Sequence, residues 1–181
     1  MTPRFREDKT TEAAAFLLKM RGGSMSYMKL IKLLYLADRE ALIRWGRPIT
    51  FDSYVSMKNG PVLSATLNLI NEGSQSDSEW TKNISTPQEY SVSMITDPGI
   101  NTLSEAEVLL LKEIFARYGS MNRWALVENV MHNLGEWRNP GPSTYTISYQ
   151  DILKASGKTE NEIDSITGDL DAIAFADAVL G

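Results

Sequence analysis

Cysteine is absent from the 181-residue chain. Its absence excludes disulfide bonds, thiolate metal ligands and a cysteine nucleophile, and it fits a reducing compartment. Histidine occurs once, at His132, so no pair of histidines can hold a zinc ion. The charged first 12 residues contain no apolar run of the kind found in a signal peptide. We therefore expect a cytoplasmic protein with no metal and no cofactor.

Basic residues are outnumbered, with 18 Lys and Arg against 23 Asp and Glu and a net charge of -5. Nucleic-acid binding needs a basic face that neutralises phosphates, so this balance disfavours nucleic acid as a partner and favours a protein. Phosphate-binding glycine loops and the Gly-x-Ser-x-Gly motif are both missing. Nothing in the sequence orients His132 for catalysis, so we expect no enzyme and no catalytic residue.

The longest apolar stretch runs from Ser24 to Trp45. It has no proline and no interior glycine, and its apolar residues surround the helix, which predicts a buried central helix. The apolar run is too short for a membrane span, which needs about 20 residues. Lys29 and Lys32 share one stripe of this helix, with Arg39 nearly in line. We expect the stripe to be the solvent-exposed edge; the alternative is that its charges pair with acidic groups elsewhere.

The N-terminal half is predicted to combine helices with a small antiparallel sheet. Alternating residues indicate a strand within Thr50–Lys58, and Asn59-Gly60-Pro61 predicts a turn that leads into a helix rather than into a hairpin partner. Two further short strands are expected to pair with this strand. The other predicted elements are a helix capped by Thr10 or Thr11 and ending near Met20, a helix from Pro61 to about Glu72, and strands at Thr81–Ser85 and Tyr90–Thr96.

The C-terminal half is predicted to be helical. Ser104 and Glu107 have capping-box spacing, and the helix they start ends near Tyr118. The remaining predicted elements are a helix capped by Ser120, an extended piece at Thr144–Ile147, a short helix ending near Ser156, and an acidic helix from Glu160 to Ala178. The fold class is therefore mainly α (α+β). We expect residues 1–181 to form one compact helical domain around the central helix, with a small antiparallel sheet inserted.

Apolar and aromatic residues suggest two further surfaces. Trp80 follows a run of polar residues, which makes it a candidate for an exposed anchor, although filling the core is the alternative. The apolar end of the last helix, Ile173 to Leu180, could serve a dimer or could pack within the chain. Both features concern contacts that the sequence does not decide.

Several unlike motifs occur in one order along the chain. They are Tyr35 with Ala37-Asp38, then Gly46-Arg47-Pro48-Ile49-Thr50, then Tyr54 to Lys58, then Gly60-Pro61-Val62, and finally His132-Asn133-Leu134-Gly135-Glu136-Trp137. In order and spacing they resemble the Panacea domain of SocA-like antitoxins. The resemblance is strong over residues 29–70 and weaker over residues 103–137.

The resemblance implies a non-enzymatic, phage-associated antitoxin of a toxin–antitoxin system. Family members neutralise protein toxins by direct binding, and at least one delivers its toxin to a cellular protease as a proteolytic adaptor. The expected partner is a cognate toxin encoded by an adjacent gene. The acidic composition adds the prediction that this toxin is basic, because complementary charge speeds association.

The motif residues fall into two predicted roles. Glycine gives backbone freedom at a turn and proline fixes φ, so we expect Gly46, Pro48, Gly60 and Pro61 to be structural, with Trp137 packing near the turn at residue 132. The residues that we expect to contact a partner are Arg47, Asp52, Lys58, Trp80 and His132. A buried polar cluster is the alternative for four of these, Arg47, Asp52, Lys58 and His132.

Two other functions remain open from the sequence. The segment Ser120–Tyr149 has the order of a winged-helix reader, which would make the protein a DNA-binding transcriptional autoregulator. Its predicted helix, however, carries Arg123 as its one basic residue, where a reading helix needs several. A phage or host interaction protein is the second alternative.

Overall fold

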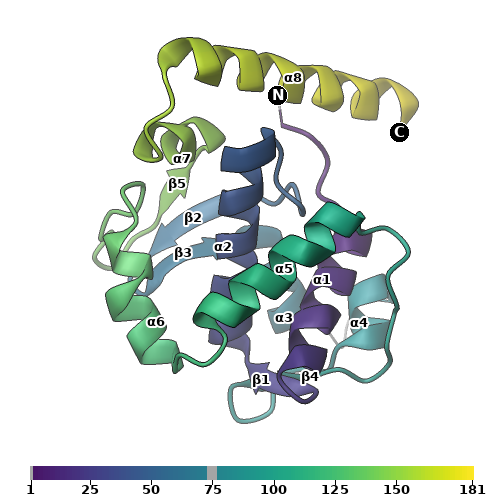
Figure 1. The fold of residues 1–181 in the computed structure, drawn as a ribbon. Coiled ribbons are helices and arrows are strands. Elements are labelled where there is room, and N and C mark those ends of the chain that lie inside the picture. Colours follow the sequence, from purple (N-terminus) through teal and green to yellow (C-terminus); the bar gives the residue numbers. More distant parts are fainter. Residues whose placement is uncertain (1, 73–76) are drawn as a thin grey trace.

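Helix α2 (Tyr27–Trp45) runs through the centre of the molecule in the computed structural model, which describes residues 2–72 and 77–181. It packs against α1 (Glu7–Met20), α5 (Glu105–Tyr118) and several shorter elements (Figure 1). Twelve of its residues are buried, as its apolar sequence predicts. The mainly α fold around a buried central helix is confirmed.

Further helices and two small antiparallel sheets complete the fold (Figure 1). Strand β1 (Ser24–Ser26) pairs with β4 (Ser91–Ser93), and a second sheet has the order β3-β2-β5. The helices are α3 (Ser64–Glu72), α4 (Glu79–Asn83), α6 (Arg123–Asn129), the 3-10 helix η2 (Met131–Asn133), α7 (Tyr149–Ala155) and α8 (Glu160–Leu180). The strands of the second sheet are β2 (Tyr54–Met57), β3 (Gly60–Leu63) and β5 (Tyr145–Ile147).

The predicted starts of the first two helices are wrong. The side chain of Ser26 caps α2 by accepting a hydrogen bond from the Lys29 N–H, so the three residues before Tyr27 are free to pair as strand β1. Helix α1 begins at Glu7, and Thr10 and Thr11 are buried inside it instead of capping it. The Thr10 hydroxyl donates to the Arg6 carbonyl, and the start of α1 has no side-chain cap.

The turn at Asn59-Gly60 joins two strands, so the predicted helix start at Pro61 is also wrong. Strands β2 and β3 form a hairpin in which Ser56 lies opposite Pro61. Proline is tolerated there because β3 is an edge strand, where a missing N–H leaves no neighbour unpaired. Helix α3 starts three residues later, at Ser64.

The predicted composition of the sheet is wrong as well. Residues 79–83 form helix α4, whose first turn is closed by a capping box between Ser78 and Thr81. The predicted strand near Tyr90 exists as β4, but it pairs with β1. The place beside β2 is taken by β5, which forms within the extended piece predicted at Thr144–Ile147. Strand pairing depends on distant segments, which local alternation does not identify.

The lysine stripe of α2 does not face solvent. Lys29 and Lys32 are buried, and each ammonium donates to a backbone carbonyl, of Gly119 and Pro61 respectively. Arg39 pairs with Glu136, as the alternative prediction allowed. Helix α2 is thus enclosed on this side too, since α5, α6 and β3 pack against it.

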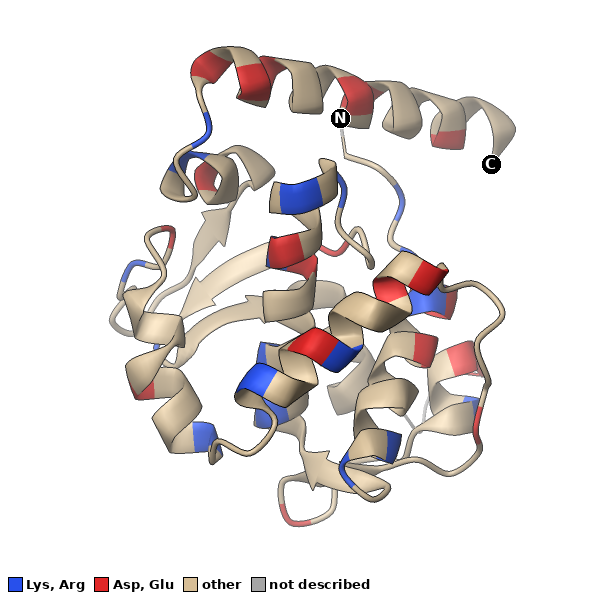
Figure 2. Cartoon of the chain, in the orientation of Figure 1, with Lys and Arg blue, Asp and Glu red and all other residues tan. Residues whose placement is uncertain are grey.

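Helix α8 lies across one end of the molecule, beside α7 (Figure 1). It carries acidic residues and no Lys or Arg, as Figure 2 shows. The acidic residues are Glu160, Glu162, Asp164, Asp169, Asp171 and Asp177. The rest of the chain therefore holds 17 of the 23 acidic residues and all 18 basic ones, so the net negative charge belongs to α8.

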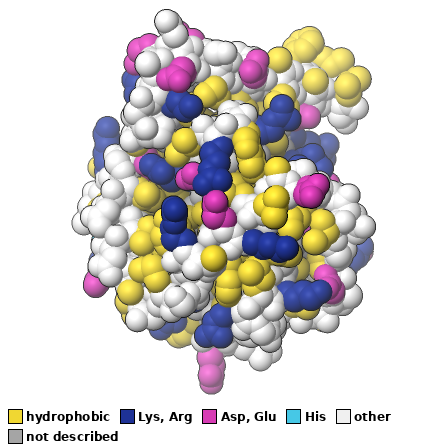
Figure 3. All heavy atoms as spheres, viewed as in Figure 1, with side chains coloured by type: hydrophobic (Ala, Val, Ile, Leu, Met, Phe, Trp, Pro, Cys, Tyr) yellow, Lys and Arg dark blue, Asp and Glu magenta, His cyan; other side chains and the backbone are white. Residues whose placement is uncertain are grey.

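The C-terminal end of α8 exposes apolar side chains. Phe175, Val179 and Leu180 are 63%, 64% and 86% exposed, whereas Ala174 is buried. Figure 3 shows this hydrophobic group at the upper edge of the molecule. The segment Ile173–Leu180 therefore packs within the chain through only part of its apolar surface.

Candidate partner-binding surface

The His-plus-Trp motif holds the β2–β3 hairpin in place. The His132 and Trp137 rings are stacked, with centroids 4.1 Å apart and planes 18° apart. The Trp137 indole Nε1–H donates to the Met57 carbonyl at 2.8 Å, and His132 Nε2 lies 3.0 Å from the Lys58 carbonyl oxygen. Both contacts are made to backbone atoms of the hairpin. Trp137 thus packs beside residue 132, and both side chains contact the hairpin backbone.

Gly60 and Pro61 form the inner side of the same hairpin. Gly60 has φ +104°, and a Cβ added there would lie 2.7 Å from the Met131 Cβ, which is too close for any real contact. The Pro61 carbonyl accepts a hydrogen bond from Lys32 Nζ at 2.8 Å. The backbone of the hairpin therefore lies directly against side chains of η2 and α2, and only glycine fits at residue 60.

Asp38 organises the turn after α2. Its carboxylate accepts hydrogen bonds from the N–H groups of Ile49 and Thr50, from the Thr50 hydroxyl and from the Tyr54 phenol. Complete burial raises the pKa of Asp38 to about 7, although these donors act in the opposite direction. Gly46 supports the turn with a left-handed φ of 74°. The Asp38 motif is therefore a buried hydrogen-bond centre whose role the sequence analysis did not identify.

Asp52 is buried, although the sequence analysis names it among the residues expected to contact a partner. It is 1% exposed and accepts hydrogen bonds from the N–H groups of Ala65 and Thr66 and from the Thr66 hydroxyl. These N–H groups belong to the first turn of α3, where backbone N–H groups have no acceptor within the helix. Burial raises the pKa of Asp52. Asp52 therefore caps α3, and its burial agrees with the alternative prediction of a buried polar group.

Glu136 ties the C-terminal motif to α2. Its buried carboxylate accepts hydrogen bonds from the Tyr35 phenol at 2.9 Å and from Arg39 Nε at 2.6 Å. Burial, and then the Glu136 charge, raise the pKa of Tyr35. Asp38, Asp52 and Glu136 each have internal donors, so the buried polar groups of the motif stabilise the fold.

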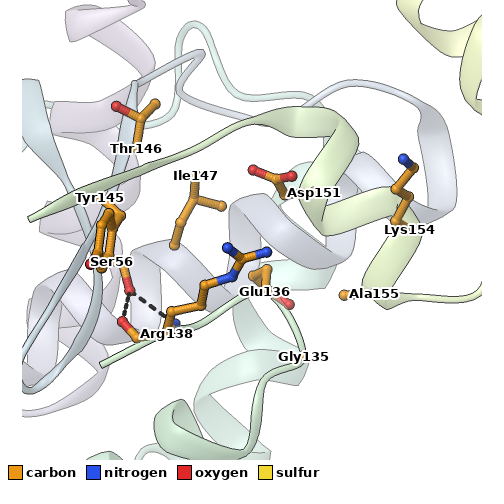
Figure 4. A pocket seen from close by; sticks show the side chains of 10 residues that line it. All are labelled: Ser56, Gly135, Glu136, Arg138, Tyr145, Thr146, Ile147, Asp151, Lys154 and Ala155. Atoms are coloured by element: carbon orange, nitrogen blue, oxygen red, sulfur yellow. Dashed lines mark hydrogen bonds between the residues drawn. The ribbon is translucent and has the colours of Figure 1, made fainter. Parts of the chain in front are cut away.

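A cavity of about 490 Å³ lies beside this ion pair, between β5, α7 and residues 135–138. Figure 4 shows the side chains of Arg138, Ile147 and Asp151 directed into it. Several of its polar groups serve the fold: Ser56 bonds the Arg138 backbone, and Asp151 caps α7. Its charges are mixed in sign, so it does not select one class of ligand.

Trp80 is in the core, which agrees with the alternative prediction and corrects the one of an exposed anchor. It is 1% exposed and lies on α4, which packs against α1.

Arg47 and Lys58 are both exposed, but they are at different ends of α2. Arg47 follows its last turn, whereas Lys58 lines a pocket with Tyr27 from its first turn. The predicted partner-binding residues do not form one site.

Another group of exposed aromatic residues surrounds Arg123. Tyr90 is 67% exposed and Trp124 is 50% exposed. The Arg123 guanidinium carbon lies 5.9 Å from the centre of the Tyr90 ring and 5.6 Å from that of Trp124, which is cation–π distance. Tyr27 extends the group, with its ring 6.5 Å from that of Tyr90. We call these four residues the aromatic patch.

The backbone contributes to this arrangement. Glu89 and Tyr90 have positive φ values of 50° and 68°, and the Tyr90 carbonyl accepts a hydrogen bond from the Tyr27 N–H. A non-glycine residue in this region is uncommon and needs support from the surrounding structure. The bond to Tyr27 gives that support and places Tyr90 beside α6. The sequence analysis missed this patch because its residues are up to 97 positions apart in the chain.

Hydrophobic and basic side chains are interspersed on the face seen in Figure 3, around α2, α5 and α6. Aromatic residues and arginine are the types enriched at energetic centres of protein interfaces. The aromatic patch therefore has the composition of a protein-binding surface. Within the described ranges, no cluster of three His, Cys, Asp or Glu residues is placed to bind a metal, and no helix has the length and apolarity of a membrane span.

Comparison with known proteins gives one match. The family model for the SocA-like antitoxin, Panacea domain, matches residues 30–138. No curated protein and no solved structure matches the chain significantly. The matched range contains every motif residue discussed above and ends before β5, α7 and α8.

Proposed function

The chain belongs to the family of SocA-like antitoxins with a Panacea domain, and on this premise we propose that it neutralises a protein toxin by direct binding. The proposed action needs no catalysis and no cofactor. The observation that carries it is the aromatic patch, where the exposed rings of Tyr90 and Trp124 lie beside Arg123, and all three are of the types that dominate protein interfaces.

The buried motif residues support a division of roles. Asp38, Asp52 and Glu136 accept hydrogen bonds from donors within the chain, and Trp137 donates one to the hairpin backbone. These residues maintain a scaffold, while the aromatic patch lies on its surface. If family members share the scaffold and differ at the surface, each member can bind its own toxin.

Co-expression with the adjacent gene tests the proposal. We expect that gene to stop bacterial growth alone, and we expect this chain to restore growth and to co-purify with the gene product. Delivery to a cellular protease, as a second mode, would shorten the lifetime of the toxin. A harmless adjacent gene product that forms no complex would contradict the proposal.

Variants of the patch locate the binding surface. Trp124→Ala and Tyr90→Ala should each weaken the complex by more than tenfold, as truncation of a central aromatic residue commonly does. Trp45→Ala is the matched control, because Trp45 is 41% exposed at the other end of α2. Equal losses from Trp45→Ala and Trp124→Ala would place the interface elsewhere.

DNA binding has less support. Helix α6 has seven residues and carries Arg123 as its one basic side chain, and this arginine packs against Tyr90 and Trp124. No observation on the described surface favours autoregulation over toxin binding. We therefore put forward toxin binding alone.

A further inference from the structure

A second pocket, of about 320 Å³, lies between the start of α2, the β2–β3 hairpin and α3. Its walls are mostly apolar, with Met28, Ile31, Met57, Val62 and Leu67. Its polar residues include two lysines and two asparagines, and none of the described residues that line it is acidic. A small apolar cavity with a few convergent polar groups is typical of a ligand-binding site.

Lys32 is the unusual residue in this pocket. It is 2% exposed, and within residues 2–72 and 77–181 its ammonium has one hydrogen-bond acceptor, the Pro61 carbonyl oxygen. An ammonium group has three donors, so two remain without a partner there. No carboxylate in the described part of the chain pairs with Lys32, whereas Arg39 on the same helix pairs with Glu136. A buried cation without a counter-charge is costly for the fold.

We propose that this pocket binds an apolar group that ends in a carboxylate, with the carboxylate on Lys32 and the apolar part among Met28, Met57 and Leu67. The ligand supplies the negative charge that the pocket lacks. The volume, at the small end of the range for ligand sites, suits one amino-acid side chain or a short organic acid. Two sources have this chemistry, a free acid and the C-terminal residue of a partner protein.

The surroundings favour an anion at this end of the molecule. Lys58 also lines the pocket, and Tyr27 and Met28 belong to the first turn of α2, which contains no acidic residue. The positive end of this long helix adds a favourable field for a carboxylate. Tyr27 belongs to both the pocket and the aromatic patch, but the inference does not depend on the antitoxin function.

Titration of Lys32 gives the proposed binding a pH dependence. Burial lowers the pKa of Lys32 to about 7, so its positive charge is present below pH 7 and is lost as the pH rises. Carboxylate affinity should therefore fall on the order of 50-fold between pH 7 and pH 9. Among the described residues, the other charged or titratable groups around the pocket are Tyr27, Lys29, Lys58 and His132. All four remain in Lys32→Met, so a flat profile in that variant assigns the dependence to Lys32.

The test uses the full chain labelled with ¹³C-methyl methionine, because Met28 and Met57 line the pocket, whereas Met20 on α1 lines a different pocket and serves as the reference. The probes are 4-phenylbutyrate against 4-phenylbutanol, and the peptide acetyl-Ala-Ala-Leu with a free carboxylate against its C-terminal amide. We expect each acid to shift the Met28 and Met57 signals and to bind at least tenfold more tightly than its neutral counterpart. The tighter of the two acids identifies the source: the peptide indicates a protein C-terminus and phenylbutyrate a free acid.

Two variants separate this role from a structural one. Lys32→Met should lose at least tenfold in affinity for the acids. Lys29→Met should change it less than twofold, because Lys29 is also buried and carbonyl-bonded but does not line the pocket. The comparison of acid with alcohol in the unaltered chain needs no variant to fold. Equal binding of acid and neutral probe, or unchanged binding by Lys32→Met, would overturn the proposal.

Discussion

At the scale of single residues, the motif positions act mainly through backbone contacts. His132 and Trp137 approach carbonyl groups of the hairpin, and Asp38 and Asp52 accept from backbone N–H groups. Side-chain bonds to the backbone fix the path of the chain whatever the neighbouring side chains are. This explains how a motif of few residues can specify a scaffold.

Gly60→Ala should be strongly destabilising. The substitution adds a Cβ at 2.7 Å from Met131 and forces an alanine to φ +104°, and together these should cost about 3 kcal/mol or more. Gly141→Ala is the matched control, since Gly141 has φ +61° and no atom within 4 Å of an added Cβ. It should cost about 1 kcal/mol.

Urea unfolding followed by circular dichroism measures both changes. The two variants share a positive φ, so the difference between them reports the contact with η2. If Gly60→Ala lost no more stability than Gly141→Ala, the hairpin would not pack against Met131 as closely as the structure shows.

At the scale of elements, helix starts are fixed by side chains from two different sources. Helices α5, α7 and α8 have local capping boxes at Ser104, Ser148 and Thr159, and the sequence predicted the first of these directly. Helix α3 is capped instead by Asp52, 13 residues before Ala65. A cap that lies outside the helix has no fixed spacing, so the sequence analysis placed the start of this helix three residues too early.

Asp52→Ala should therefore destabilise the protein more than the loss of a local cap. It leaves the part-buried Ala65 N–H, the buried Thr66 N–H and the Thr66 hydroxyl without their acceptor, at a cost of about 2–3 kcal/mol. Ser148→Ala, which removes an exposed local cap from α7, should cost about 1 kcal/mol. Thermal unfolding compares the two. A smaller effect for Asp52→Ala would show that α3 does not depend on this carboxylate.

At the scale of the whole molecule, charge and aromatic surface are separated. The acidic helix α8 lies near Gly46, after the last turn of α2, whereas the aromatic patch includes Tyr27 in the first turn. The 19 residues of α2 span about 28 Å, several times the Debye length of about 8 Å at physiological salt. The acidic charge of the chain therefore contributes little at the patch, and the prediction of a basic toxin depends on which end the toxin meets.

Neutralising α8 distinguishes these two ends. If the toxin binds at the aromatic patch, Asp164→Asn with Asp169→Asn should change its association rate less than twofold at 0.15 M salt. The control, Glu72→Gln with Asp77→Asn, makes the same charge change away from α8. Stopped-flow association at several salt concentrations gives the rates. A several-fold decrease confined to the α8 variant would instead show that a basic toxin meets this helix.

The sequence by itself determined the elements whose signals are local. The apolar stretch of α2, the capping box at Ser104, the acidic helix α8 and the order of the family motifs were all read correctly from neighbouring residues. Hydrophobic periodicity and capping depend on residues a few positions apart, so one chain without structure is enough to find them.

Tertiary structure decided everything that depends on distant partners. It buried Lys32 and Trp80, paired β2 with β5, and brought Tyr90 to Arg123. Whether a charged or aromatic side chain is exposed depends on what packs over it, and local sequence does not contain that information. The main helices could therefore be predicted from the sequence, whereas the sheet pairing and the two candidate binding sites exist only because the folded chain places separate segments together.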